Sequence, residues 1–527
     1  MRQRSRYSTP SILNHPGKMR SKKIFGFSVS LILINMASVM ERADENLLPA
    51  VYKEVSEAFN AGPTELGYLT FIRNFVQAIS SPLAGLLALH YDRPTVLTIG
   101  TACWALSTAA VGASQHFQQV ALWRAVNGFG LAIVIPALQS FIADSYMDGS
   151  RGVGFGLLSL VGAIGGIGGG ILATIMAEQE YWGMPGWRFA FIMIASLSLL
   201  IGLLVFLFVV DPRRTSFISS GAHVETERSH LVTKGSLPPP SVWSDSWLAM
   251  RSVMRVQTFQ IIVLQGIVGS LPWTAIVFFT MWFELIGNEQ VGNVFTRSEL
   301  ISKDLGLYLK VPYIVVTYTL YNKTLSSLGF DHKSSAALNS LFAIGCATGS
   351  LLGGIIADQM SRYYPDSGRI ICAQFSAFMG IPFSWILLTV IPQSVSNWYA
   401  FATTLFFMGL TISWCATCAN NPMFAEVVPS KHRTMIYAFD RAFEGSFSSF
   451  AAPAVGMLTE KIYGYDSKFV SLVNGSPQGA FALSRGLLIM MVIPFGLCCL
   501  FYSPLYFVFK HDRDNAKMAS RKEQELI

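Results

Sequence analysis

Charged residues are scarce in this chain. Asp, Glu, Lys and Arg make up 13% of its 527 residues, against roughly 25% in a typical soluble domain. Hydrophobic residues make up 52% and gather in runs long enough to cross a bilayer, which takes ~20 helical residues. The 44 glycines suit helices that approach one another closely in lipid. The composition therefore predicts an all-α integral membrane protein.

Cysteines are few, and all seven lie within apolar runs, so we expect no disulfide framework. Cys415 and Cys418 have the spacing of a redox motif, but inside a predicted membrane helix we interpret them as packing residues. The sequence also lacks a nucleophile elbow, a phosphate-binding loop and a zinc motif, and neither His90 nor His432 has metal-ligand spacing. These absences argue against an enzyme, and we expect no cofactor and no metal.

Acidic residues are missing from the N-terminal region, since none precedes Glu41 while residues 1–23 contain seven Lys and Arg. We interpret 1–23 as a basic cytosolic tail that orients the first helix. An organellar transit peptide, which is also rich in Arg and Ser and poor in acids, is the alternative. Basic residues also gather in short loops and in a second cytosolic tail at 510–527. The net charge of +7 therefore indicates membrane orientation and no nucleic-acid partner.

The apolar runs predict 12 transmembrane helices in two pseudo-symmetric six-helix bundles, which cover 24–210 and 256–509. The first six runs lie near 24–50, 65–90, 95–113, 117–141, 151–177 and 188–210, and the last six near 256–285, 334–357, 369–391, 396–420, 434–459 and 478–509. The even number places both termini on the cytosolic side. The second bundle is longer between its first two helices, and we assign the extra residues to an insertion at 288–330 in the loop between helices 7 and 8. A genuine insertion and a gene-model artefact both stay open.

The segment 211–255 between the bundles is rich in Ser, Pro and charge, and we predict a flexible cytosolic linker. At its end, Trp243, Trp247, Met250 and Met254 recur with helical spacing beside basic residues. That pattern is typical of a helix lying on a membrane surface.

A short stretch occurs once in each half and indicates an internal duplication. In each copy, a long apolar run ends in Gly, and Arg follows eight residues later before the next run begins. This pattern predicts a charged hairpin between two membrane helices. Leu89 occupies the position that Asp358 takes in the second copy. We predict that the two hairpins are gating loops, with these residues in them: Gly85, Asp92, Arg93, Gly354, Asp358 and Arg362.

Ionisable side chains inside predicted membrane helices are expensive and mark candidate sites. In the first helix, Asn35, Glu41, Arg42 and Glu45 fall on one helical face and are predicted to line a central cavity. Burial disfavours the Glu41 anion and Arg42 favours it, so Glu41 is the candidate proton acceptor. The alternative is that the helix ends at Met40 and these charges lie at the membrane interface.

Five further charged residues are candidates. Arg73 in the second helix either binds an anionic substrate group or snorkels to the outer interface. Arg124 begins an Arg-x-x-x-Gly-x-Gly pattern in the fourth helix, where the alternative is an interface charge. Asp440, Arg441 and Glu444 in the eleventh helix suggest a second charged site or an inner gate, and the alternative is a local ion network.

The hairpin repeat resembles the loop signature G-x-x-x-D-R-x-x-R of the major facilitator superfamily. With the stretch Asn35–Glu45 and the Arg124 motif, nearly the whole chain outside 211–255 and 288–330 resembles the Spinster-like branch, in a plant-type group. The resemblance implies two rocking bundles, a link between Arg124 and proton coupling, and Glu41-Arg42 in place of an Asp-Arg pair. Leu131 stands where the branch has Glu.

We therefore predict a secondary transporter that works by alternating access, proton-coupled through Glu41, and moves a small organic or lysolipid-like anion across the bilayer as a monomer. A uniporter of a neutral solute is the alternative within transport, and a receptor or scaffold on the same fold is the alternative outside it. The predicted membrane is the plasma membrane or a vacuolar or endosomal membrane, ahead of an organellar one. The substrate, the direction and the coupling ion stay open.

Overall fold

The computed structural model describes residues 23–24, 27–59, 63–147, 149–177, 179–212, 242–276, 278–279, 282–283, 286, 332–450 and 477–525. Most of the predicted N-terminal tail and linker, the predicted insertion and the end of the eleventh predicted helix lie outside these residues. Most described residues are helical, and the others form loops and two short antiparallel hairpins. These pair β1 (Lys23–Ile24) with β2 (Phe27–Ser28) and β3 (Glu180–Tyr181) with β4 (Met184–Pro185).

The described residues of the first half form eight helices. They are α1 (Val29–Ala50), α2 (Tyr52–Phe59), α3 (Pro63–Ser80), α4 (Pro82–His90), α5 (Arg93–Ala113), α6 (Phe117–Ser145), α7 (Arg151–Ala177) and α8 (Gly186–Phe208). The second predicted membrane helix is divided between α3 and α4 at Ser81, because Pro82 begins a new helix where its missing N–H is tolerated.

The second half is built in the same way, with more irregular segments. Its helices are α10 (Val242–Met254), α11 (Gln257–Ile276), α14 (His332–Tyr363), α15 (Gly368–Trp385), α16 (Trp398–Ile412), α17 (Asn421–Val427), α18 (Arg433–Ser448), α20 (Pro477–Phe501) and α21 (Leu505–Glu525). π-Helical turns extend α15 as η2 (Ile386–Val390) and precede α17 as η4 (Cys415–Asn420). The last predicted membrane helix ends at Phe501 rather than at 509, and the predicted C-terminal tail is helical in α21.

Within the described residues, nine helical segments are long and apolar enough to cross a membrane. The other three predicted membrane helices fall short for identifiable reasons. α1 carries four charged residues in its second half, the second predicted helix is divided at Ser81, and the eleventh is described only as far as Phe450. The structure is thus an all-α, multi-pass membrane fold.

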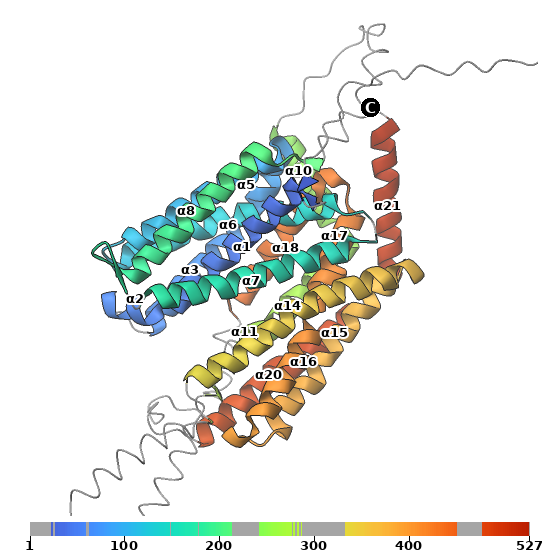
Figure 1. The fold of residues 1–527 in the computed structure, drawn as a ribbon. Coiled ribbons are helices and arrows are strands. Elements are labelled where there is room, and N and C mark those ends of the chain that lie inside the picture. Colours follow the sequence, from blue (N-terminus) through green and yellow to red (C-terminus); the bar gives the residue numbers. More distant parts are fainter. Residues whose placement is uncertain are drawn as a thin grey trace, which may run out of the picture.

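The helices pack as two bundles, with α7 of the first against α14 of the second (Figure 1). α18 belongs to the second half but packs against α3, α4 and α6 of the first, so it lies between the bundles. α10 contacts α11 and α18, and α21 contacts α11 and α17. We call the end of the bundles that carries α10 and α21 the linker end, and the opposite end the far end.

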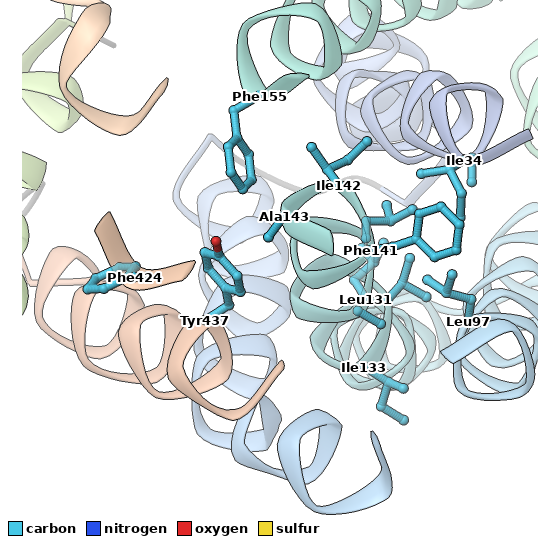
Figure 2. Close-up of a cluster of buried hydrophobic side chains, with 14 of the residues drawn as sticks. Ile34, Leu97, Leu131, Ile133, Phe141, Ile142, Ala143, Phe155, Phe424 and Tyr437 are labelled. Atoms are coloured by element: carbon cyan, nitrogen blue, oxygen red, sulfur yellow. The ribbon is translucent and has the colours of Figure 1, made fainter. Parts of the chain in front are cut away.

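The apolar core shows where the halves are joined. One continuous cluster of buried side chains runs through both halves, whereas a second cluster around Trp282 and Phe401 is confined to the second half. Figure 2 shows part of the shared cluster, where Tyr437 of α18 lies near Phe155 of α7 and Phe424 of α17. All three residues lie within two turns of a linker-end helix terminus, so the shared core seals the linker end.

Candidate functional site

Two acidic and two basic residues from α1 and α3 meet through their side chains. We call Glu41, Arg42, Glu45 and Arg73 the α1 cluster. Arg42 Nη1 donates to Glu45 Oε2 at 2.6 Å, and Arg42 Nε lies 3.4 Å from Glu41 Oε2. Arg73 Nη1 lies 3.7 Å from Glu45 Oε1. Because α1 continues to Ala50, the alternative in which the helix ends at Met40 is wrong.

The members of the α1 cluster differ in exposure. The side chains of Arg42 and Glu45 are 45% and 37% exposed, whereas those of Glu41 and Arg73 are 6% and 3% exposed. Solvent reaches the Arg42–Glu45 pair, while the other two members are held inside the protein. The cluster therefore combines an accessible ion pair with two buried ionisable groups.

The second half contributes charge to the same place. Arg441 of α18 interacts electrostatically with both Glu41 and Glu45. On the same helix, Asp440 and Glu444 interact with each other and with Arg441. The Glu444 carboxyl packs directly on Gly266 of α11, where a Cβ atom would collide with it. The structure thus brings the α1 cluster and the α18 triplet (Asp440, Arg441 and Glu444) together across the two halves.

A second, fully buried network lies behind the α1 cluster. Thr108 Oγ1 of α5 donates to Asp44 Oδ1 at 2.6 Å, and Asn127 Nδ2 of α6 donates to Asp44 Oδ2 at 3.1 Å. Asn127 Oδ1 in turn accepts from Arg73 Nε at 3.0 Å. The sequence analysis did not select Asp44 or Asn127. The sequence does contain a signal for Asp44. It lies on the same face of α1 as Ile34, Ala37 and Leu48, where an apolar residue is expected.

Two further predicted site residues lie on α1 and α6. Asn35 Nδ2 donates to the Leu31 carbonyl one turn back on α1, at 2.8 Å. Arg124 is buried on α6, about one turn from Asn127 toward the far end. It is therefore Asn127 of that motif that touches Arg73.

The first predicted gating loop closes the linker end through ion pairs. Arg93 pairs with Asp144 of α6, and its backbone N–H donates to Asp211 Oδ2 at 3.2 Å. Asp144 also pairs with Arg433 of α18, so one carboxylate joins the two halves. Gly85 allows the halves to touch, since a Cβ atom there would lie 2.8 Å from the Met435 Cα.

The second predicted gating loop closes the same end in a different way. Asp358 accepts from the backbone N–H groups of Gly152 and Val153, at 3.0 and 2.7 Å, where α7 begins. Its partner is Arg369, with Nη2 at 2.9 Å from Oδ1, whereas the predicted Arg362 is exposed. A carboxylate at a helix N-terminus satisfies free N–H groups and favours the helix dipole.

The contacts at Gly152 are also tight. A Cβ atom at Gly152 would lie 2.6 Å from the Gly354 carbonyl oxygen, so glycine is needed for α7 and α14 to approach this closely. Nearby, the hydroxyls of Ser140 and Thr434 are 2.8 Å apart across the two halves. The linker end is therefore closed by apolar, polar and ionic contacts together.

Comparison with known proteins identifies the family. Residues 34–322 match the model of the Major Facilitator Superfamily. The chain is 24% identical to protein spinster homolog 1 of Rattus norvegicus, over 82% of this chain and 72% of that protein. It is 21% identical to the sphingosine-1-phosphate transporter of Danio rerio, over 92% of this chain and 85% of that one.

A solved structure has the same fold. It is a bacterial homologue of the human lysosomal transporter Spinster, in an inward-facing and unoccupied conformation. The TM-score is 0.53 at 15% sequence identity, with 92% of this chain and 98% of that chain covered.

Proposed function

Because this chain belongs to the Major Facilitator Superfamily and is Spinster-like, we propose that it moves an organic, lipid-like anion and that protons drive the transport. The solute binds between the halves, at the α1 cluster and the α18 triplet. The two halves, 24–210 and 256–509, rock about that site, and the chain works as a monomer. The phosphate in the substrate of the zebrafish relative supports an anionic solute.

The observation that carries this proposal is the excess of acid at the site. The α1 cluster, Asp44, the α18 triplet and Arg124 together contain five carboxyl groups and four guanidinium groups. An anion is repelled by this excess unless carboxyl groups take up protons. Proton binding and anion binding therefore favour each other, which is the linkage that a proton-coupled carrier of an anion needs.

The closed linker end supports the direction of access. The positive-inside pattern assigns the linker end and both chain termini to the cytosol. With that assignment, the closed linker end corresponds to an outward-facing state, in which the solute reaches Arg42 and Glu45 from the far end. The absence of a carboxylate at Leu89 would favour the receptor alternative, but Arg93 keeps Asp144 and Asp211 as partners.

The test is uptake by proteoliposomes under an imposed pH gradient, with sphingosine-1-phosphate, a lysophosphatidate and citrate offered in parallel. We expect uptake of a phosphate-bearing lipid that collapses with the gradient. Glu41→Gln should remove the dependence on the gradient, and Glu57→Gln on the exposed surface of α2 is the matched control. Uptake that ignores the gradient in the unmodified protein would instead support a uniporter. Binding without uptake would support a receptor.

A further inference from the structure

Asp44 and Asn127 are fully buried. They connect α1 and α6 to Arg73, because Asp44 lies on α1, Asn127 on α6 and Arg73 on α3. We propose that Asp44 and Asn127 are positioning residues, which hold the Arg73 guanidinium against Glu45 and thereby set the affinity for the solute. This inference rests on the proposed role of the α1 cluster as the solute site.

The orientation of the Asn127 amide is the first step. An ionised carboxylate only accepts hydrogen bonds, and a guanidinium only donates them. Asn127 must therefore turn its NH2 group to Asp44, 3.1 Å away, and its oxygen to Arg73 Nε, 3.0 Å away. Thr108 Oγ1 donates to the same carboxylate at 2.6 Å and accepts from Asn127 Nδ2 at 2.9 Å. Asp44 thus determines which atom of Asn127 is presented to Arg73.

The second step concerns Arg73 itself. A Cβ atom at Gly128 would collide with the Arg73 carbonyl oxygen, so the backbones of α3 and α6 touch at this point. Gly128 therefore fixes the backbone of Arg73, and its neighbour Asn127 fixes the side chain. A guanidinium held by both constraints remains 3.7 Å from Glu45 before the solute binds. Solute binding therefore loses no free energy to the ordering of the Arg73 side chain.

The charges around Arg73 make its position important. α1 presents Glu41, Arg42 and Glu45, α6 carries Arg124 and α18 presents Arg441. Within a site of low polarity, a shift of one guanidinium by a few ångströms changes the field at every other member. If Asn127 no longer holds Arg73, the solute should bind more weakly and the pH dependence of transport should move.

An exchange of the two side chains gives the sharpest test. Asp44→Asn removes the charge and replaces one acceptor oxygen by an NH2 group that competes with Asn127 Nδ2 for Thr108 Oγ1, and Asn127→Asp places two carboxylates side by side. In the double variant Asp44→Asn/Asn127→Asp, the new carboxylate accepts directly from Arg73 and from the new amide. We expect KM for the transported lipid to rise about tenfold in each single variant, as for a lost hydrogen bond to a charged group, with Vmax nearly kept. The double variant should recover most of the loss and the original pH profile.

A second readout does not depend on transport. A cysteine reporter is introduced by Glu45→Cys, beside the Arg73 guanidinium. The protein without this substitution gives the reaction rate of the native cysteines, and that rate is subtracted. Anionic and cationic methanethiosulfonates are compared in detergent. The ratio of the anionic to the cationic rate should fall severalfold when Asp44→Asn is added to the reporter, although that change removes a negative charge, and it should return in the double variant. Asn127→Asp also lowers the ratio through its own added charge, so Asn127→Ala measures the lost contact alone. Arg73→Lys gives the ratio expected when the Nε contact is absent.

The outcomes separate this inference from the proposed function. A ratio that falls in the single variants and returns in the double variant supports the positioning role of Asp44 and Asn127. If the protein also transports no lipid, the transport proposal fails but the positioning inference stands. An unchanged ratio in the single variants overturns the inference, and so does an equal fall in the single and double variants, which indicates a packing role. If Asp44→Asn does not fold, Asn127→Ala tests the same contact without adding a charge, and an unchanged ratio there also overturns the inference.

Discussion

The two hairpins occupy matching places in the two halves but close the linker end by different chemistry. In the second half, Asp358 satisfies the first N–H groups of α7 and pairs with Arg369. In the first half, Leu89 stands in the matching position, and Arg93 is held by Asp144 and Asp211 instead. Arg369 also pairs with Glu426, as Arg93 pairs with Asp144, so Asp211 is the carboxylate that takes the place of the one missing at Leu89.

Other parts of the duplication are kept closely. Arg151 Nε donates to the Ala143 carbonyl at 2.9 Å, and Arg433 Nε donates to the Ala425 carbonyl at 3.0 Å. Each arginine begins the helix after the fourth or tenth predicted membrane helix. The repeat therefore keeps the same chain turn at the linker end in both halves. The carboxylate that joins the halves, in contrast, occupies a different position in each repeat. The comparison predicts unequal effects for matching substitutions.

The largest effect is expected for Asp358→Leu, which makes the second hairpin like the first. It removes the acceptor of two N–H groups and leaves Arg369 with Glu426 as its remaining carboxylate partner. Breaking a buried pair costs about 3–5 kcal/mol, so the linker end should open. Spin labels at Met147 and Tyr364, both exposed and one in each half, would report a longer distance. Arg362→Ala is the control, and a distance that stays short in Asp358→Leu contradicts the assignment.

A smaller but clear effect is expected for Asp144→Asn. The substitution keeps the shape of the side chain and removes the charge that both Arg93 and Arg433 need. Asp211 still holds Arg93, so we expect about 2 kcal/mol less stability of the closed linker end, near the value of a hydrogen bond to a charged group. The same spin labels measure it. An effect as large as that of Asp358→Leu would mean that Asp211 does not compensate.

A modest effect of opposite sign is expected for Leu89→Asp, which restores the repeat. A carboxylate near the start of α18 favours the helix dipole by about 0.3–1 kcal/mol. The closed linker end should become more populated, and transport should slow if opening is the limiting step. Leu89→Asn provides the uncharged comparison. An equal shift in both variants would rule out the dipole as the cause.

The smallest effect concerns pH. Burial, with help from Lys431, lowers the pKa of His432 below its usual 6.5, and the ring lies 3.3 Å from Ser252 Oγ of α10. The closed state therefore binds fewer protons there than a state in which His432 is exposed. Closure should be fully stable above pH 6.5 and weaken as the pH falls below it. His432→Gln should flatten this part of the spin-label pH profile, and an unchanged profile would contradict the role of His432.

Much of this molecule is predictable from the chain alone. Runs of apolar residues predict where most of the described membrane helices lie, although the last one ends at Phe501 and not at 509, because a bilayer demands about twenty apolar residues in a row. The glycine and arginine spacing identifies the hairpins, and the three- and four-residue steps from Glu41 to Glu45 select the α1 charges. These signals are local, so they can be found without knowing which helices are neighbours.

Pairing between distant segments depends on the packing instead. Arg362 has the right spacing in the sequence, yet Arg369 reaches Asp358 because it starts the next helix and is buried beside it. Asp44 interrupts an apolar stripe, but its importance depends on Thr108 and Asn127, which lie 64 and 83 residues away. Hydrogen bonds and ion pairs act over about 3–4 Å. Only the arrangement of the helices brings such side chains within that range, whereas hydrophobicity and turn preference act on each segment by itself.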